Sequence, residues 1–378
     1  MRRQAIVVGA GSYVLGDSWG HGVVLPTLLD ERRSGGLDSI HLVVRTPRDA
    51  AFHARLAALG AELGLDPSIH EHVLASEAGL EELPLEDSVA FVCVPDSRHA
   101  TYARAFVERG VPTWLVKPMT GRGDESRALD DLARERDVPL WVDYHKRFDA
   151  SNKKLAALVD GGSLGRMLLY SVQYTQPWRL PLRELSTWSR EVDVFQYIGC
   201  HYVDLLFFLF PEAVPRRVSA TGLPGRLAAE GGPAHDVVHA VIDFAVAGRA
   251  LRADFQVGWN DPGGTPAKSH QRVECIFTHG RIVADQKERG FELWSEDRFD
   301  QVNPHFLQVL PDPLRGGTRV EGYGPDSIRG FLAAHDSPAA RASTALPWSA
   351  QAWRVDLVLD QVRASLADDG AWIECAWR

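Results

Sequence analysis

A tyrosine and a histidine stand four residues apart near the middle of the chain, where apolar residues repeat with helical spacing. Tyr197 and His201 are therefore expected on one face of a helix. A histidine can accept the proton of a hydroxyl group because its ordinary pKa is near neutrality. Asp204 lies three residues further on and either hydrogen-bonds the imidazole or serves helix packing. On spacing alone, the more common explanation of His201 is a histidine that caps or packs inside an apolar helix.

A lysine before a proline is the second candidate for chemistry. Lys117 follows the apolar run of residues 113–116, and Pro118 favours extended backbone at that position. In α/β folds, ligands bind beyond the carboxyl ends of parallel strands, where a lysine ammonium can polarise a substrate oxygen. The alternative is a solvated surface lysine.

A glycine-rich segment follows the first apolar run, residues 5–8. Gly9 and Gly11 are placed as in the turns that bring backbone N–H groups to the pyrophosphate of a dinucleotide. Val14 occupies the position of a third glycine, and the next helical pattern begins only at 23–29, so the loop is predicted to be longer than the standard fingerprint. Two glycines after a strand are often an ordinary turn, but this place in an alternating chain favours a cofactor site. The predicted loop contacts come from Gly9, Gly11, Ser12 and Tyr13.

The end of the second apolar run, residues 40–44, bears on the choice of cofactor. An acidic residue here binds the ribose 2′-hydroxyl of NAD, whereas an arginine accommodates the 2′-phosphate of NADP. Arg45, Thr46 and Arg48 follow the run, and no acidic residue precedes Asp49. The pattern favours NADP, with NAD as the alternative. Surface arginines are common at strand ends, however, and Asp49 also fits the first turn of the next helix.

Two kinds of secondary structure must position these candidates. The first part of the chain alternates short apolar runs with stretches of helical spacing, which is typical of a parallel sheet covered by helices. After Tyr144, long alternating runs predict a largely antiparallel sheet. We therefore expect an α/β fold, with a doubly wound parallel Rossmann sheet in residues 1–143 and an α+β domain with a large, mainly antiparallel open sheet in residues 144–378. The predicted strands are 5–8, 40–44, 89–94, 113–116, 140–142, 166–174, 237–246, 250–258, 272–277 and 281–285, and the helices are 23–29, 49–64, 99–109, 150–159 and 348–368.

Composition and charge restrict the class of protein. A chain of 378 residues exceeds one ordinary core, and 45% hydrophobic with 24% charged residues is the balance of a globular protein. The net charge of −9 argues against nucleic-acid binding, which needs a basic face. The longest apolar stretch, 202–210, is too short to span a membrane. The four cysteines have no metal-ligand spacing, so we expect no metal and a reduced, soluble, cytoplasmic protein.

Several motifs that follow one another along the chain match a known family in type and order. They are a strand with a Pro-Asp turn and a histidine at 92–99, Lys117-Pro118, a domain-crossing segment at 141–149, a Gly-x-His-x-x-Asp helix at 199–206, and a Gly-x-Ile strand pair at 280–286. With these motifs the chain resembles the glucose–fructose oxidoreductase / inositol dehydrogenase / MocA family.

The resemblance implies an NAD(P)-binding Rossmann domain, a substrate domain, and catalytic roles for Lys117, His201 and Tyr197. Family sheets commonly pair across a dimer interface, so a homo-oligomer through the C-terminal sheet is expected. The chain departs from the family at two positions. Val116 replaces the usual glutamate before the lysine, and Tyr197 stands where members commonly carry an aspartate. Beyond the loop and strand-end residues, the implied cofactor contacts are Val94, Pro95, Asp96, His99, Lys117, Pro118 and His145.

An aromatic and polar segment at 173–188 is a candidate wall of the substrate site. Aromatic rings stack on sugar faces, and arginine and glutamine side chains hydrogen-bond hydroxyl groups. The eleven tryptophans of the chain weaken this interpretation, because many must belong to the ordinary core. The predicted substrate contacts are Lys117, Tyr174, Gln176, Trp178, Arg179, Tyr197 and His201, with Arg183 and Trp188 as further wall residues.

The residues and the resemblance together predict an oxidoreductase that transfers a hydride between a nicotinamide and a secondary alcohol, or the matching ketone, of a sugar, sugar derivative or cyclitol. One alternative is a reductase of a non-carbohydrate substrate, such as an imine or a tetrapyrrole-type pyrrole. Another is a non-catalytic NADP-binding regulator, which the replacement at Tyr197 favours and the presence of Lys117 and His201 opposes. The expected partners are a small-molecule substrate and further copies of the chain, not nucleic acid or membrane.

Overall fold

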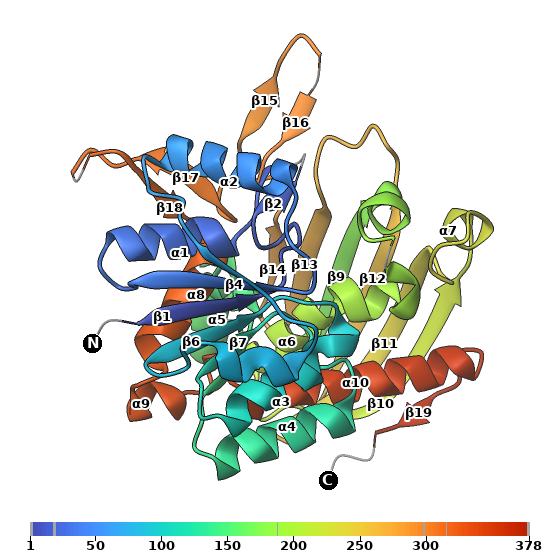
Figure 1. The fold of residues 1–378 in the computed structure, drawn as a ribbon. Coiled ribbons are helices and arrows are strands. Elements are labelled where there is room, and N and C mark those ends of the chain that lie inside the picture. The colour runs from blue at the N-terminus through green and yellow to red at the C-terminus, as the bar shows by residue number, and fades with distance from the viewer. Residues whose placement is uncertain (1–2, 18–19, 187, 298, 315, 376–378) are drawn as a thin grey trace. The chain divides into compact units, whose positions relative to one another are not determined.

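The computed structural model describes residues 3–17, 20–186, 188–297, 299–314 and 316–375. Contacts between residues divide the chain into two compact units. The first unit comprises residues 1–120, 124–149 and 305–353, and the second comprises residues 121–123, 150–304 and 354–378. Figure 1 labels most of their helices and strands.

The first unit is built on a sheet of six strands in the order β5-β4-β1-β6-β7-β8, and every pairing is parallel. Figure 1 labels β1, β4, β6 and β7 among these strands. The strand order reverses beside β1, and ligands of open α/β sheets bind beyond the carboxyl ends of the strands at such a reversal. This order confirms the predicted Rossmann sheet. The strands are β1 (Gln4–Val8), β4 (Ser39–Val44), β5 (His70–Val73), β6 (Ser88–Val92), β7 (Thr113–Leu115) and β8 (Leu140–Val142).

Helices connect these strands and bury the sheet. Apolar side chains of α1 and α2 share one core with Val7 and Leu42, which lie on the same face of the sheet. The second helix begins where the Asp49 carboxylate accepts the N–H of Phe52 and ends at Gly64, whose left-handed backbone (φ 63°) stops the helix. The helices are α1 (Val24–Arg33), α2 (Ala50–Leu63), α3 (His99–Glu108) and α4 (Gly123–Glu135).

A later segment, residues 305–353, also belongs to the first unit. The ring of Trp348 packs edge-to-face on Trp141 with centroids 4.8 Å apart, and the Arg329 guanidinium pairs with Asp30 of α1 at 2.7 Å. The unit therefore differs from the continuous domain of residues 1–143 that the sequence predicts, because these contacts join residues far apart in the chain. The segment contains β17 (Gln308–Pro311), β18 (Thr318–Glu321), α8 (Tyr323–Ala334) and α9 (Pro338–Arg341), and α10 (Ser349–Ala367) begins in it.

The second unit is built on a seven-stranded sheet in the order β14-β13-β9-β12-β11-β10-β19. Only the pair β9–β12 is parallel among the pairings described, which confirms a mainly antiparallel sheet. Along β12, Leu251, Ala253 and Phe255 are buried and alternate with polar residues on the outer face. The strands are β9 (Met167–Pro177), β10 (Val214–Leu223), β11 (Val237–Val246), β12 (Arg249–Asp261), β13 (His270–Phe277), β14 (Gly280–Asp285) and β19 (Ile373–Glu374), and β15 (Glu292–Trp294) and β16 (Phe299–Gln301) form a separate hairpin.

The α-helices of this unit are α5 (Ala150–Asp160), α6 (Cys200–Leu209), α7 (Arg226–Ala229) and the larger part of α10, residues 354–367. The helix α6 packs on the buried face of the sheet, where the Tyr170 hydroxyl donates to the Tyr202 carbonyl at 3.1 Å and Phe207 meets Phe244 edge-to-face. Within the described residues, no helix combines the length and the apolar character that a membrane span requires.

Candidate active site

The glycine loop after β1 folds as one helical turn, residues 11–15, which we call the first turn. The N–H groups of Val14 and Leu15 donate to the carbonyl of Gly11 at 2.9 and 3.3 Å. The chain then makes a short hairpin, β2 (Gly16–Asp17) and β3 (Gly20–His21), before α1 begins.

The helix α1 is hydrogen-bonded directly onto the first turn. The N–H groups of Val23 and Leu25 donate to the carbonyls of Tyr13 and Val14, at 2.8 and 2.9 Å. The hairpin is thus an insertion between the first turn and the rest of the helix. The loop is longer than the standard fingerprint, as the sequence predicts, and residues 11–13 stand at the start of this isolated turn, while α1 itself begins at Val24.

Gly9 and Gly11 have opposite surroundings. Gly9 has a φ of 103°, and a Cβ there would lie 2.1 Å from the Cys93 carbonyl oxygen, so only glycine fits between β1 and β6. A Cβ at Gly11 would meet no heavy atom within 4 Å. Within the described residues, the N–H groups of Gly11, Ser12 and Tyr13 donate no hydrogen bond. An open space beside undonated N–H groups at the start of a helical turn fits the pyrophosphate of a dinucleotide.

The residues at the end of β4 surround a basic position. Arg45 and Thr46 are exposed, and the Arg48 guanidinium donates to the Thr46 hydroxyl at 3.0 Å. The backbone N–H of Arg48 donates to the Glu71 carboxylate of the neighbouring strand at 2.8 Å. Asp49 is occupied as the N-cap of α2, which is the structural role that the sequence left open for it. The exposed cationic side chain at the strand end is therefore Arg45, which suits a 2′-phosphate.

One buried histidine links the turn after β6 to the segment that follows β7 through contacts with two backbone carbonyls. His99 Nδ1 lies 2.8 Å from the Pro118 carbonyl, and its Nε2 lies 2.9 Å from the Val94 carbonyl. The Lys117–Pro118 peptide is cis, and Lys117 is half-buried. His99 thereby fixes two of the segments that the sequence assigns to the cofactor, residues 94–99 and 117–118, to each other at the carboxyl edge of the sheet.

A buried carboxylate that sequence reasoning missed lies among the predicted cofactor residues. Asp143, which directly follows β8, accepts a hydrogen bond from the Tyr13 hydroxyl at 2.6 Å. His145 Nδ1 lies 3.3 Å from that hydroxyl and 3.3 Å from the Asp143 carboxylate. An acidic residue immediately after a parallel strand, inside the segment that resembles the family, was the signal that could have identified Asp143.

The second unit carries the histidine and tyrosine singled out by their spacing. His201 lies in the first turn of α6 and its side chain is buried, as is Asp204. Tyr197 lies just before α6, in a π-helical turn (Phe195–Gly199), so the two residues do not share one continuous α-helix as expected. The Tyr197 ring packs between Trp188 and Trp259, with centroids 5.5 Å away in each case.

The predicted substrate wall separates into packed and accessible residues. Trp259 Nε1 donates to the Gln176 side chain at 3.2 Å, and Tyr174 packs edge-to-face on Tyr202 in the core. The Trp178 ring is covered by the Arg226 guanidinium, 3.2 Å from its centroid. Arg179 is half-buried and Arg183 is exposed. The structure thus brings Gln176 and Tyr197 into contact with the same residue, Trp259, whereas Tyr174 is mainly a core residue.

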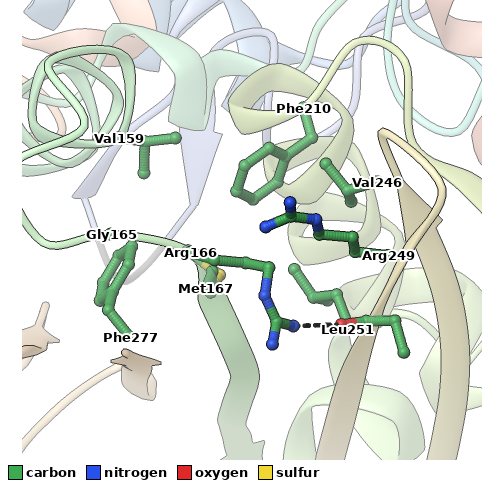
Figure 2. Close-up of a pocket in the computed structure, with 10 residues that line it drawn as sticks. Val159, Gly165, Arg166, Met167, Phe210, Val246, Arg249, Leu251 and Phe277 are labelled. Carbon is green, nitrogen blue, oxygen red and sulfur yellow. Dashed lines mark hydrogen bonds between the residues drawn. The ribbon is translucent and has the colours of Figure 1, made fainter. Parts of the chain in front are cut away.

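A hollow in the second unit lies at the other end of the same strands. Figure 2 shows Phe210 and Arg249 beside it, with Arg166 donating to the Ala250 carbonyl at 3.0 Å. Arg166 directly precedes β9 and Arg249 begins β12, whereas Gln176 stands near the end of β9. The hollow is therefore separate from the predicted substrate wall. Within the described residues, no group of three or more His, Cys, Asp or Glu side chains could hold a metal ion.

Comparison with known families agrees with this geometry. A family model described as "Oxidoreductase family, NAD-binding Rossmann fold" matches residues 47–144, and one described as "GFO/IDH/MocA C-terminal domain" matches residues 152–283. The chain belongs to the Gfo/Idh/MocA family. This membership confirms the resemblance drawn from the motifs and makes the protein an NAD(P)-dependent oxidoreductase.

Similar proteins of this family act on cyclitols and sugars. The chain is 26% identical over 281 residues to a scyllo-inositol 2-dehydrogenase (NADP(+)) from Bacillus subtilis, covering 72% of this chain and 75% of that protein. It is 24% identical over 324 residues to levoglucosan dehydrogenase from Pseudarthrobacter phenanthrenivorans, covering 76% and 79%. An inositol dehydrogenase homologue from Azotobacter vinelandii, crystallised with NADH and myo-inositol, superposes with a TM-score of 0.71 at 18% identity, covering 99% and 97%. This last likeness shows the shared fold.

Proposed function

We propose that this Gfo/Idh/MocA protein transfers a hydride between NAD(P) and a secondary alcohol, or the matching ketone, of a sugar, sugar derivative or cyclitol. The observation that carries the proposal is the first turn at the strand-order reversal, with Gly11 open to solvent and the N–H groups of residues 11–13 undonated. The relatives named as inositol and levoglucosan dehydrogenases support the substrate class.

The cofactor would be held by residues of the first unit. The first turn would donate its N–H groups to the pyrophosphate, and Gly9 allows that turn to approach β6. We assign the adenosine ribose to Arg45, Thr46 and Arg48, and this basic strand end supports NADP over NAD. The remaining proposed contacts are Val94, Pro95, Asp96, His99, Lys117, Pro118 and His145.

The bound nicotinamide would accept the hydride, and a side chain of the protein must then accept the proton of the hydroxyl group. We propose that His201 accepts this proton, since a neutral imidazole is the ordinary base at neutral pH. Lys117 would polarise the substrate oxygen as an ammonium donor. Tyr197, held between two tryptophans, would orient the substrate, together with Gln176, Trp178 and Arg179. Tyr174 remains a proposed substrate contact, although its ring is mostly buried.

The experiment that tests the function combines binding and turnover. Dissociation constants for NADP and NAD are measured by titration, and a panel of cyclitols, aldoses and anhydrosugars is then screened for reduction of the cofactor. We expect binding and turnover of at least one polyol. Cofactor binding without turnover on polyols, ketones or cyclic imines would support the regulator, and turnover on imines alone would support the non-carbohydrate reductase.

We also propose that the protein assembles through the outer face of the second unit's sheet. That face carries ion pairs between neighbouring strands, such as Arg217 and Arg252 with Asp243 at 2.8 Å each. Light scattering on purified protein, repeated with Arg252→Glu, tests the assembly. A monomer in the unaltered protein would contradict it. Because all four cysteines are free thiols, we place the protein in the cytoplasm.

A further inference from the structure

The inserted hairpin leaves the first turn with an unusual attachment. In an uninterrupted helix, the first turn is followed directly by the next turn, but here β2 (residues 16–17) and β3 (residues 20–21) stand between the first turn and α1. Val14 also stands where a third glycine would let helix and strand pack closely. The hydrogen bonds from Val23 and Leu25 hold the Tyr13 and Val14 end of the turn, whereas Gly11 and Ser12, at its other end, are exposed.

The side chain of Tyr13 makes a further contact. Its hydroxyl donates to Asp143 Oδ2 at 2.6 Å. Burial of this hydroxyl and the adjacent Asp143 carboxylate raise the pKa of Tyr13 well above its ordinary value, so the phenol stays protonated and remains a donor. Tyr13 thus links the first turn to the residue that follows β8.

Asp143 is held rigidly to receive that bond. Its backbone N–H donates to the Leu115 carbonyl of β7 at 2.8 Å, and the whole residue is 1% exposed. The Ser327 hydroxyl of α8 donates to Asp143 Oδ1 at 2.7 Å, which leaves Oδ2 directed at Tyr13. His145, 3.3 Å from Oδ2, packs its ring against Tyr323 of α8 with centroids 5.6 Å apart.

We infer that Asp143 is a positioning residue for the cofactor: through the Tyr13 hydroxyl it holds the first turn in the orientation that presents the N–H groups of residues 11–13. This inference rests on the proposed function, because it assumes that the first turn binds the pyrophosphate. A hydrogen bond to a charged, buried acceptor is among the stronger ones in proteins. Without the hydrogen bond between Tyr13 and Asp143, the first turn is less ordered, and ordering it when the cofactor binds costs free energy.

The test measures two properties of Tyr13→Phe, Asp143→Asn and the double variant. The first is hydrogen exchange of residues 10–15 in the cofactor-free protein, and the second is the dissociation constant for NADPH. Tyr102→Phe is the matched control: Tyr102 is a buried tyrosine of α3 whose hydroxyl makes no hydrogen bond within the described residues. Circular dichroism accompanies each variant, and Tyr13→Phe carries the test if Asp143→Asn does not fold.

We expect each single variant to raise the dissociation constant by about tenfold or more and to speed exchange of residues 10–15, with the control unchanged. The double variant should bind no more weakly than the weaker single variant, because both remove one bond. Additive losses would show that Tyr13 contacts the cofactor independently of Asp143, which contradicts the inference. Unchanged exchange in both single variants would also contradict it. If the unaltered protein fails to bind NADPH or NADH, the proposed function fails, while the exchange measurement still decides whether Asp143 orders the turn.

Discussion

Adding one methyl group at Gly9 and at Gly11 should have opposite consequences, because the two positions differ in the space around them. At Gly9, a Cβ would lie 2.1 Å from the Cys93 carbonyl oxygen and 2.9 Å from its carbon, on a backbone with φ of 103°. The first turn would have to move by about 1 Å to reach van der Waals contact, and alanine at this φ costs a further ~1–3 kcal/mol. At Gly11, a Cβ would meet nothing within 4 Å.

We therefore expect Gly9→Ala to lose about 3 kcal/mol of folding free energy, and its melting temperature to fall by roughly 6–12 °C. Gly11→Ala should melt within a degree or two of the unaltered protein. Its methyl group would instead occupy the space assigned to the pyrophosphate. Loss of one or two N–H contacts to a charged group, at about 1.5–3 kcal/mol each, should weaken NADPH binding by at least tenfold.

The assays are differential scanning fluorimetry without cofactor and NADPH titration by fluorescence. Gly263→Ala is the matched control, since a Cβ there also meets nothing within 4 Å and it lies outside the loop. It should change neither quantity. If Gly11→Ala binds NADPH as tightly as the control, the space beside Gly11 does not hold the pyrophosphate and the assignment of the loop is wrong.

Three further predictions concern single side chains. Arg45→Ala should weaken NADP binding by about 1.5–3 kcal/mol while leaving NAD binding nearly unchanged, and an unaltered ratio of dissociation constants would contradict the strand-end assignment. Lys117→Ala should leave cofactor affinity nearly intact and lower kcat by about two orders of magnitude or more; equal turnover would make Lys117 a surface residue. Burial, and then the neighbouring His70 and His72, lower the pKa of His41 to about 4. This pKa is below the ordinary value that His41 has in the unfolded chain, so protonation of His41 favours unfolding. The contribution of His41 to stability is therefore fully present above about pH 6.5 and is lost as the pH falls towards 4. Urea titration should give a free energy of unfolding about 1–2 kcal/mol lower at pH 5 than at pH 7, and a smaller loss in His41→Asn; equal losses in both proteins would contradict the assignment.

The sheet of the first unit could be predicted from sequence because its signals are local. The strands β1, β4, β6, β7 and β8 are short apolar runs, and β1, β4 and α2 lie within a residue or two of the predictions. The edge strand β5, with the polar sequence His-Glu-His-Val, and the helix α4 were not predicted. No local signal in the sequence indicates that residues 305–353 pack with the first unit. This packing depends on contacts such as Trp141 with Trp348 and Asp30 with Arg329, which join residues about two to three hundred positions apart. The strand β10 was missed because its pattern of buried residues is irregular.

Residues of the candidate site could be predicted from the sequence where the local geometry requires a particular residue type. Gly9 must be glycine because of the Cys93 carbonyl, and a glycine directly after the first strand is a visible consequence of that close approach. Asp143 could not be assigned in the same way, since its role depends on a hydrogen bond from a residue 130 positions earlier. The π-helical turn at Tyr197 was also hidden, because helical spacing does not distinguish a π turn from an α turn.

We propose that the protein oxidises a secondary alcohol with NAD(P) and that His201 is the base. The most direct test is the pH dependence of kcat for a polyol substrate in the unaltered protein and in His201→Asn, with Tyr197→Phe as the control and circular dichroism to verify folding. Only neutral histidine can accept the proton, so turnover should rise with pH through an apparent pKa near neutrality. In His201→Asn this rise and most of the rate should disappear, whereas Tyr197→Phe should keep the rise with a smaller loss of rate. If folded His201→Asn retains both the rate and its rise with pH, the base lies elsewhere and the claim is contradicted.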